Sequence, residues 1–479
     1  MRVNAQRQQT LGLNFFTNDQ LEEIHFAAIE ILNRIGVRVY SEEALELLRK
    51  GGARINGDIA KIPAYMVQEA LSSAPCKVSI GTRDGKRAMN LQKNSIHFGT
   101  GSDTPFVYDL FTGERRTSKK SDVVNYARVS DALENIDFVM SLALASDVPT
   151  LNSYKHHFEA MVTNTTKPIC FTAHNAQDLK DIIEMAEVAV DGAENLVANP
   201  FIFSYLEPTS PLVHSQEAIE KLMICAEKNV PAIYAIAILG GASGPVTQAG
   251  AIAQGIAEML SGLVIHQLKY KGAPIIFGGG ARPMNMTTMG CPYGGPEPDL
   301  GRIAVVKMAQ FYNLPSFTTS GCSDAQVFDQ QAGMEIGFSL LSAGLAGGNL
   351  IHDLGYLGMG MTSSMESLLL CNETAGIVKH FLGGIEINEE TLALDTMERV
   401  GPGGNYLTEE HTFKNFRKQI FDTKLLNRNG YDKWFQNGAY SFKDMANKKA
   451  QEILENHRPI IMPTEKANKI KEIACRKIK

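Results

Sequence analysis

The strongest constraint on the fold is a regular alternation of apolar runs with amphipathic helical segments. Seven runs rich in apolar and β-branched residues occupy 137–147, 167–175, 200–211, 231–241, 273–283, 314–324 and 349–357. Helical patterns lie between them, as in 246–270, where Ile252, Ile256 and Met259 fall on one face. Continuously apolar strands are typical of parallel sheets that are buried on both faces. The pattern therefore predicts βαβ units and an α/β fold.

The number of repeats suggests how the sheet closes. One further strand from 95–111 would bring the total to eight, so we predict a (β/α)8 TIM barrel over residues 95–400. A doubly wound open sheet is the alternative. No GxGxxG motif follows the first strand, which makes that alternative weaker without removing it.

The two ends of the chain lack the alternation of apolar runs and helical segments. Residues 1–94 predict a mainly helical elaboration, whose first helix begins with a capping box of Thr17 and Gln20 and ends near Gly36. Residues 401–479 are rich in lysine and helical in pattern, so we expect a C-terminal helical extension that packs on the outside of the barrel.

Composition excludes several classes of partner. The 479 residues carry a net charge of −6, and no basic stripe precedes the last few residues, so no nucleic acid partner is expected. We find no signal sequence and no apolar run of membrane-spanning length, which indicates a cytoplasmic protein without a membrane partner. The seven cysteines are scattered and form no zinc-like set, so we expect reduced thiols and no metal site.

Polar residues gather where the apolar runs end. They include Asp147, His174, Glu207, Gly280, Arg282, Asp324, His352, Asp353 and Tyr356. The carboxyl ends of barrel strands meet at one mouth, where the active sites of this architecture lie. His352 and Asp353 are adjacent in an apolar strand, so they cannot both be solvated, and buried ionisable groups need partners. We therefore place this pair in the wall of a central pocket.

Longer blocks of sequence resemble a known family. The segments 290–315, 319–373 and 400–412, together with LEEIHFAAIEILNRIGVRV near the N-terminus, closely resemble the trimethylamine methyltransferase (MttB) superfamily. The chain contains only standard residues, so it resembles the branch without pyrrolysine, whose members demethylate quaternary amines. The resemblance implies a barrel that moves a methyl group from an amine to the cobalt of cobalamin, a corrinoid carried by a separate cognate corrinoid protein. No cofactor is then expected to be bound tightly by this chain.

The chemistry of a quaternary amine is consistent with that branch. A quaternary ammonium leaves as a neutral tertiary amine, so neither a proton nor a zinc ion is needed to activate it. Direct SN2 attack by Co(I) disperses charge and is favoured in a desolvated pocket. We accordingly assign no residue as acid, base or nucleophile.

The substrate-binding candidates follow from the two ends of a betaine. Aromatic faces bind the ammonium group, and the candidates are Phe106, Tyr108, Tyr205, Phe317 and Tyr356. Donors for the carboxylate are Arg282, His174 and His352, oriented by Asp353, Asp324 and Glu207. Structural roles compete with each assignment: an aromatic residue can fill the core, His174 can be satisfied by the backbone, and Asp324 can cap a helix.

Glycines supply the last group of candidates. Gly279, Gly280, Gly358, Gly360, Gly403 and Gly404 are expected to form a rim that faces the corrinoid, because glycine lets backbone approach a large planar group. Glycine betaine, which would yield dimethylglycine, is the first substrate candidate, ahead of proline betaine, carnitine and γ-butyrobetaine. A betaine-binding barrel without catalysis and a lyase that uses His352 as its base are the alternatives. A homo-oligomer is also expected.

Overall fold

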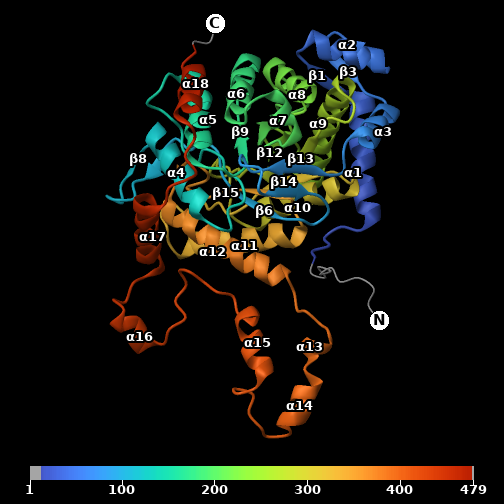
Figure 1. The fold of residues 1–479 in the computed structure, drawn as a ribbon. Coiled ribbons are helices and arrows are strands. Elements are labelled where there is room, and N and C mark those ends of the chain that lie inside the picture. The colour runs from blue at the N-terminus through green and yellow to red at the C-terminus, as the bar shows by residue number, and fades with distance from the viewer. Residues whose placement is uncertain (1–11, 477–479) are drawn as a thin grey trace.

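A barrel of parallel strands forms the centre of the computed structural model, which describes residues 12–476 (Figure 1). Within that range, seven strands are hydrogen-bonded in the order β6-β15-β14-β13-β12-β10-β9. Their bounds are β6 (His97–Thr100), β9 (Ile169–Phe171), β10 (Ile202–Leu206), β12 (Ala232–Gly240), β13 (Ile275–Pro283), β14 (Ser316–Thr319) and β15 (Leu350–Leu354). Each pair is parallel.

The gap between β6 and β9 is closed by the first of the predicted runs. Phe138 bridges Gly99 of β6, and Val139 bridges Ile169 of β9, both in parallel. The run 137–147 is much shorter as a strand than its composition suggests, because Leu142 has a φ of 57° and turns the chain away. With these two bridges, the segment at Phe138 and Val139 takes the place of an eighth strand and closes the barrel.

Each of the eight positions is followed by a helix, as predicted. In the part of the chain that the structure describes, these helices are α4 (Lys120–Ala132), α5 (Ser153–Asn164), α6 (Ala176–Ala189), α8 (Gln216–Lys228), α9 (Gln248–Lys269), α10 (Pro296–Phe311), α11 (Gln330–Ala346) and α12 (Met365–Leu382). The prediction of a (β/α)8 barrel is confirmed. Within residues 12–476, only α9 is long and apolar enough to cross a membrane, and 89% of that stretch is buried inside the fold.

The N-terminal segment contains helices and small β structures. Its elements are α1 (Asn18–Glu30), a π-helical turn (Ile31–Ile35), β1 (Val37–Val39), α2 (Glu42–Gly51), β2 (Arg54–Asn56), β3 (Ile59–Lys61), α3 (Ala64–Ser73), β4 (Val78–Gly81) and β5 (Ala88–Leu91). The predicted capping box of Thr17 and Gln20 is present. β1 lies between β3 and β11 (Val213–His214), so a small sheet ties this segment to the barrel. Residues 1–11 lie outside the described residues.

The β4–β5 hairpin closes one end of the barrel. Its Val78, Ile80, Met89 and Leu91 pack in one cluster with residues that point into the barrel, among them Phe203. The backbone N–H of Gly81 donates to the carbonyl of Pro200, just before β10, at 2.7 Å. The hairpin therefore covers the amino ends of the strands, which leaves the carboxyl ends as the open face.

A smaller sheet lies beside the open face. A sheet in the order β16-β17-β7-β8 joins the loops that follow β6 and β15. Its strands are β7 (Phe106–Tyr108), β8 (Arg115–Thr117), β16 (Tyr356–Leu357) and β17 (Thr362–Ser363). Elsewhere, a 3-10 turn (Thr150–Asn152) precedes α5, and the short helix α7 (Ala193–Ala198) precedes β10.

The C-terminal region divides into a projecting part and a part that packs on the barrel. Its helices are α13 (Glu389–Leu392), α14 (Leu394–Val400), α15 (Glu410–Gln419), α16 (Tyr431–Gln436), α17 (Phe442–Asn456) and α18 (Thr464–Ala474). α17 packs on α4 and α12, and α18 packs on α5 and α6. The last barrel helix ends at Leu382, so residues 383–400, which the sequence assigned to the barrel, belong to the projecting part (Figure 1). Residues 477–479 lie outside the described chain.

Candidate active site at the barrel mouth

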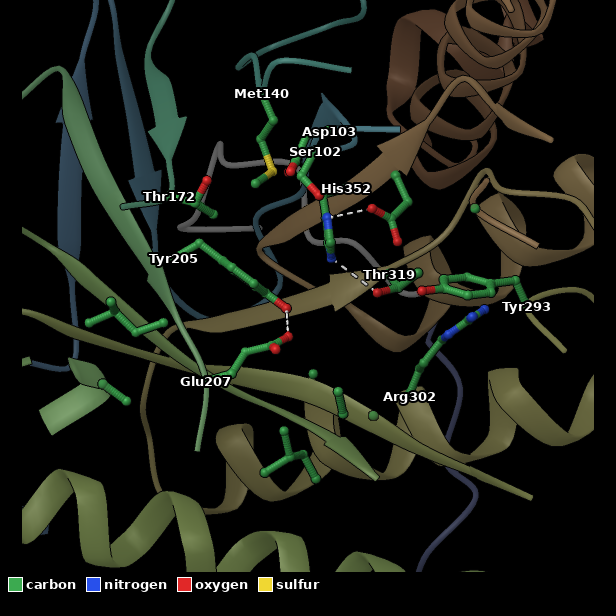
Figure 2. A pocket seen from close by; sticks show the side chains of 18 of the residues that line it. Ser102, Asp103, Met140, Thr172, Tyr205, Glu207, Tyr293, Arg302, Thr319 and His352 are labelled. Carbon is green, nitrogen blue, oxygen red and sulfur yellow. Dashed lines mark hydrogen bonds and ion pairs between the residues drawn. The ribbon is translucent and has the colours of Figure 1, made fainter. Parts of the chain in front are cut away.

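A pocket of about 460 Å³ opens at the carboxyl ends of the barrel strands (Figure 2). Residues from β10, β12, β13, β14 and β15 form its inner wall. The loops after β6 and β13 and the first turn of α8 complete it. The mouth predicted from the polar strand ends is therefore a real cavity.

His352 and Asp353 both face this pocket, although neighbouring residues in a regular strand point to opposite sides. The pairing of β15 with β6 shifts register between Ile351 and Leu354, and Asp353 has a φ of 77°. A left-handed conformation is costly for a residue other than glycine and is found mainly at functional sites. This local distortion is what brings the two side chains to the same cavity.

The contacts of His352 fix the orientation of its ring. Its Nδ1 lies 2.8 Å from a carboxylate oxygen of Asp353, but the contact lacks the angle of a hydrogen bond. Its Nε2 lies 3.0 Å from the hydroxyl of Thr319. The ring stacks on Phe317 with the two centroids 4.0 Å apart. The imidazole is thus held in place by the protein on two sides.

Tyr205 and Glu207 form a second pair, at the end of β10 (Figure 2). The Tyr205 hydroxyl donates to the Glu207 carboxylate. Water can reach Glu207 inside the recess, but protein surrounds it on the other sides. This desolvation raises the pKa of Glu207 above its usual value, against the opposing effects of Tyr205, His352 and Arg282. The carboxyl group is therefore less acidic than an ordinary glutamate.

Asp103 supplies another pocket carboxyl group, from the loop after β6. Burial raises its pKa, and the hydrogen bonds from Tyr154 and Ser102 oppose the rise only in part. The Tyr356 hydroxyl lies 3.1 Å from that of Ser102. Acidic and phenolic groups thus share one side of the cavity.

The opposite wall carries arginines around Tyr293. The Arg282 guanidinium carbon lies 4.3 Å from the centre of the Tyr293 ring, and its Nε donates to the sulfur of Cys291 at 3.0 Å. Arg302, from α10, donates from Nη1 to Asp299 at 2.9 Å. Its Nη2 is buried and has no hydrogen-bond partner among the described residues. A buried donor without a partner is costly, so this nitrogen is available for a ligand.

Several predicted residues line the pocket and others lie behind it. The lining includes Tyr205, Glu207, Gly279, Gly280, Arg282, His352, Asp353, Tyr356 and Gly360. Phe317 is fully buried beneath the His352 ring. His174 packs against Tyr154, with ring centroids 4.3 Å apart, and contacts the Thr150 carbonyl at 3.0 Å. Of the two roles considered for His174, the structure therefore has the one in which the backbone satisfies the ring.

Three other predicted residues serve the walls rather than the cavity. The Phe106 ring lies under the Arg115 guanidinium at 3.6 Å, and the Tyr108 hydroxyl donates to the Gln326 carbonyl at 2.5 Å. Asp324 accepts from the Tyr293 N–H at 2.8 Å, so it holds the loop that carries Tyr293.

The predicted glycine rim is only partly at the pocket. Gly279 has a φ of 99°, and a Cβ there would meet the Ile236 carbonyl at 2.0 Å. A Cβ on Gly280 would lie 3.0 Å from the Arg302 side chain, so these two glycines have packing reasons for their identity. Gly358 lies beside Gln326, outside the lining. Gly403 and Gly404 belong to the projecting region that begins after α12, so they do not line the pocket.

Sequence reasoning missed several of the lining residues. They are Ser102, Asp103, Met140, Tyr154, Thr172, Lys221, Tyr293 and Arg302. Tyr293 lies inside the block 290–315 that carried the family resemblance, so that block was the available signal for it.

Comparison with known proteins identifies the family. The family model described as trimethylamine methyltransferase (MTTB) matches residues 2–479. The chain belongs to this family. It is 32% identical over 475 residues to trimethylamine methyltransferase MttB of Desulfitobacterium hafniense, covering 99% of this chain and 96% of the relative.

Other relatives are similar over nearly the same length. The chain is 30% identical to a glycine betaine methyltransferase of D. hafniense, covering 94% of each chain. It is 33% identical to MttB of Methanosarcina barkeri, over 93% of this chain and 91% of the relative. A solved hydroxylamine complex of MtmB has the same fold, with a TM-score of 0.52 at 13% identity, over 92% of this chain and 90% of the other. These relatives are methyltransferases, which supports an enzyme of that class.

Proposed function

We propose that this MTTB-family protein takes a methyl group from a quaternary amine that also carries a carboxylate. Glycine betaine is the first candidate, with release of dimethylglycine. The acceptor is Co(I) of a corrinoid carried by a separate protein. The similarity to a glycine betaine methyltransferase supports the donor class. Proline betaine, carnitine and γ-butyrobetaine share the same two charged ends and are the alternative donors.

The observation that carries this proposal is the two-sided character of the pocket. The phenol rings of Tyr205 and Tyr356 line one part of it, and Arg302, whose Nη2 has no partner within the described chain, belongs to the wall around Tyr293. Aromatic faces attract a quaternary ammonium by about 0.5–2 kcal/mol per contact. A guanidinium nitrogen is a strong donor to a carboxylate. A zwitterion with both groups therefore satisfies both sides of the cavity.

The raised pKa values of Asp103 and Glu207 suit the proposed transfer. SN2 attack on a quaternary ammonium disperses its positive charge, so a full carboxylate beside the nitrogen would stabilise the bound substrate more than the transition state. Burial raises the pKa of both Asp103 and Glu207, so each holds its proton to a higher pH than an ordinary carboxyl group does. These residues can then contact the substrate without holding its cation strongly.

The corrinoid protein is proposed to bind over the open face of the barrel. The β4–β5 hairpin covers the amino ends of the strands, so the carboxyl ends are the accessible side of the pocket. Gly360, with a φ of 76°, lies next to Tyr293 in the pocket lining. We assign this glycine to the rim that the corrinoid approaches.

The proposal is tested by following cobalt spectroscopically. The purified chain is mixed under anaerobic conditions with Co(I) cobalamin and glycine betaine, and the loss of the Co(I) band and the gain of methyl-Co(III) are recorded. We expect methylation with a betaine and none with trimethylamine. Calorimetric binding of betaines without methylation, even in the presence of the cognate corrinoid protein, would instead identify a binding protein.

A further inference from the structure

The segment 383–420, which we call the arm, has apolar side chains that nothing in the described chain covers. It contains α13, α14 and α15 and projects from the body on the side of α11 and α12 (Figure 1). α13 and α15 contain no buried residue, and α14 contains only Thr396. The exposed large residues of the arm include Ile385, Leu392, Leu394, Met397, Tyr406, Leu407, Phe413, Phe416 and Ile420.

The arm is nevertheless a built structure with fixed ends. It starts where α12 ends, at Leu382, and it returns at Phe421, whose ring lies 5.9 Å from that of His380 on the same helix. Directly after it, the Thr423 hydroxyl donates to the buried carboxylate of Glu373 at 2.6 Å. Both ends of the arm are therefore attached to α12.

The helices of the arm need a partner for their stability. Helices shorter than about 12 residues are marginal in water unless one face is packed. Phe413 and Phe416 lie on one face of α15, with Ile420 directly after it, and 79%, 48% and 64% of their respective surfaces are exposed. An amphipathic helix in this state has a binding face without a cover.

A matching apolar surface lies on α11 of the same chain. Met334, Phe338 and Leu341 are spaced by one and two helical turns, and they are 68%, 53% and 36% exposed. We call these three residues the α11 stripe. The arm of the same chain leaves this stripe exposed, so each chain presents both an uncovered arm and an uncovered stripe.

We propose that the arm is a dimerisation element that packs on the α11 stripe of a second copy of this chain. Two-fold symmetry lets each arm cover the stripe of the other chain, so both surfaces are buried in both copies. The arm residues named above expose on the order of 1,000 Å², compared with the roughly 800 Å² per partner of a standard interface.

The position of the arm favours a second copy over the corrinoid protein. α12 begins directly after the β17 strand beside the mouth and contains 18 residues, which corresponds to a length of roughly 27 Å. The arm starts at the far end of that helix. A protein that must place cobalt over the pocket would bind at the opposite end, so this pairing leaves the mouth free.

The test measures the mass of the full-length chain in solution by light scattering during gel filtration. We expect twice the monomer mass of 52.4 kDa for the natural sequence. The arm variant F413S/F416S and the stripe variant F338S should each raise the dimer dissociation constant by roughly 30-fold or more. F111S is the matched control, because Phe111 is 72% exposed but lies outside both surfaces.

A mixing experiment distinguishes exchange of arms from other pairings. The arm variant and the stripe variant together retain one intact contact, so an equimolar mixture should recover dimer that neither variant forms alone. Circular dichroism checks that each variant is folded. A monomeric natural chain overturns the proposal, and so does a dimer that F338S leaves intact. Loss of corrinoid-protein binding by the arm variant of a monomeric chain would assign the arm to that partner instead.

Discussion

Arg302 is held by one of its nitrogens and has another free for a ligand. Nη1 donates to Asp299, whereas Nη2 is buried without a partner in the described chain, and the residue lines the pocket. Replacing Arg302 with lysine keeps a positive charge beside Asp299 but removes the forked donor. We expect R302K to raise the KM for glycine betaine by roughly 10- to 150-fold, the value of a charged hydrogen bond.

Tetramethylammonium is the control substrate for this prediction, because it has the cation without the carboxylate. R302K should change the apparent affinity for tetramethylammonium, measured by calorimetry, less than twofold. An equal loss for both ligands would show that Arg302 supports the pocket and does not bind the carboxylate.

Glu207 is expected to lower stability at neutral pH. Because its pKa is raised in the folded protein, the native state holds the proton more tightly than the unfolded state does. Stability is then unaffected below the usual pKa of about 4.3 and is lost as pH rises through the raised pKa. E207Q should therefore have a higher thermal midpoint than the natural chain at pH 8, and the two should agree at pH 4. A lower midpoint for E207Q at pH 8 would contradict this.

The sequence predicted site residues where strand ends carry them. His352 and Asp353 could be placed in the pocket because two adjacent ionisable residues interrupt an apolar strand. Arg302 could not be placed in the pocket in this way, because an arginine in an amphipathic helix normally belongs to the solvent-exposed face. Its position depends on Gly280, which leaves room for the side chain across β13. That contact is three-dimensional, and the sequence signal for Arg302 is only its place in the block 290–315.

Among the elements of the fold, closure of the barrel depends on the close contact between Gly99 of β6 and the ring of Phe138. Phe138 lies against Gly99 so tightly that a Cβ on Gly99 would meet its ring at 2.2 Å. G99A should therefore lower the free energy of unfolding by about 1–3 kcal/mol, as overpacking does in buried cores. Urea denaturation measures the change. G333A on α11 is the control, since a Cβ there meets no atom within 4 Å and alanine favours the helix.

Helices in which apolar residues recur regularly over several turns could be predicted from the sequence. Strands of only two or three residues could not. The eight barrel helices repeat their apolar faces over several turns, so their pattern is clear. β1, β2 and β3 have three residues each, which is too short for a strand period to appear. β1 also pairs with β11, far away in the sequence. Only the folded barrel brings those two segments together.

At the scale of the whole molecule, three buried histidines are expected to lower stability in acid. His157, His214 and His266 are buried, and desolvation lowers the pKa of each to about 3. The unfolded chain binds protons to these groups below about pH 6.5, so stability is full above that value and is lost as pH falls towards 3. Each histidine contributes a slope of up to about 1.4 kcal/mol per pH unit.

Denaturant titrations at pH 7, 6, 5 and 4 measure this slope. H214N removes one titrating group and keeps hydrogen-bonding atoms near Tyr234 and Ser261, which contact His214 at 2.6 and 2.8 Å. The dependence of stability on pH should become shallower in H214N than in the natural chain. Parallel curves for the two proteins would show that His214 does not contribute.

The end of α18 contacts α5, a helix that also contributes Tyr154 to the wall of the pocket. Lys155 is fully buried and donates to the carbonyl of Arg476 at 2.7 Å, while its neighbour Tyr154 lines the cavity. Cys475 is exposed next to this contact, and Cys76 is exposed in the N-terminal segment. A fluorophore attached to Cys475 in a C76S background would thus act as a docking sensor, whose emission changes when another protein settles over the mouth.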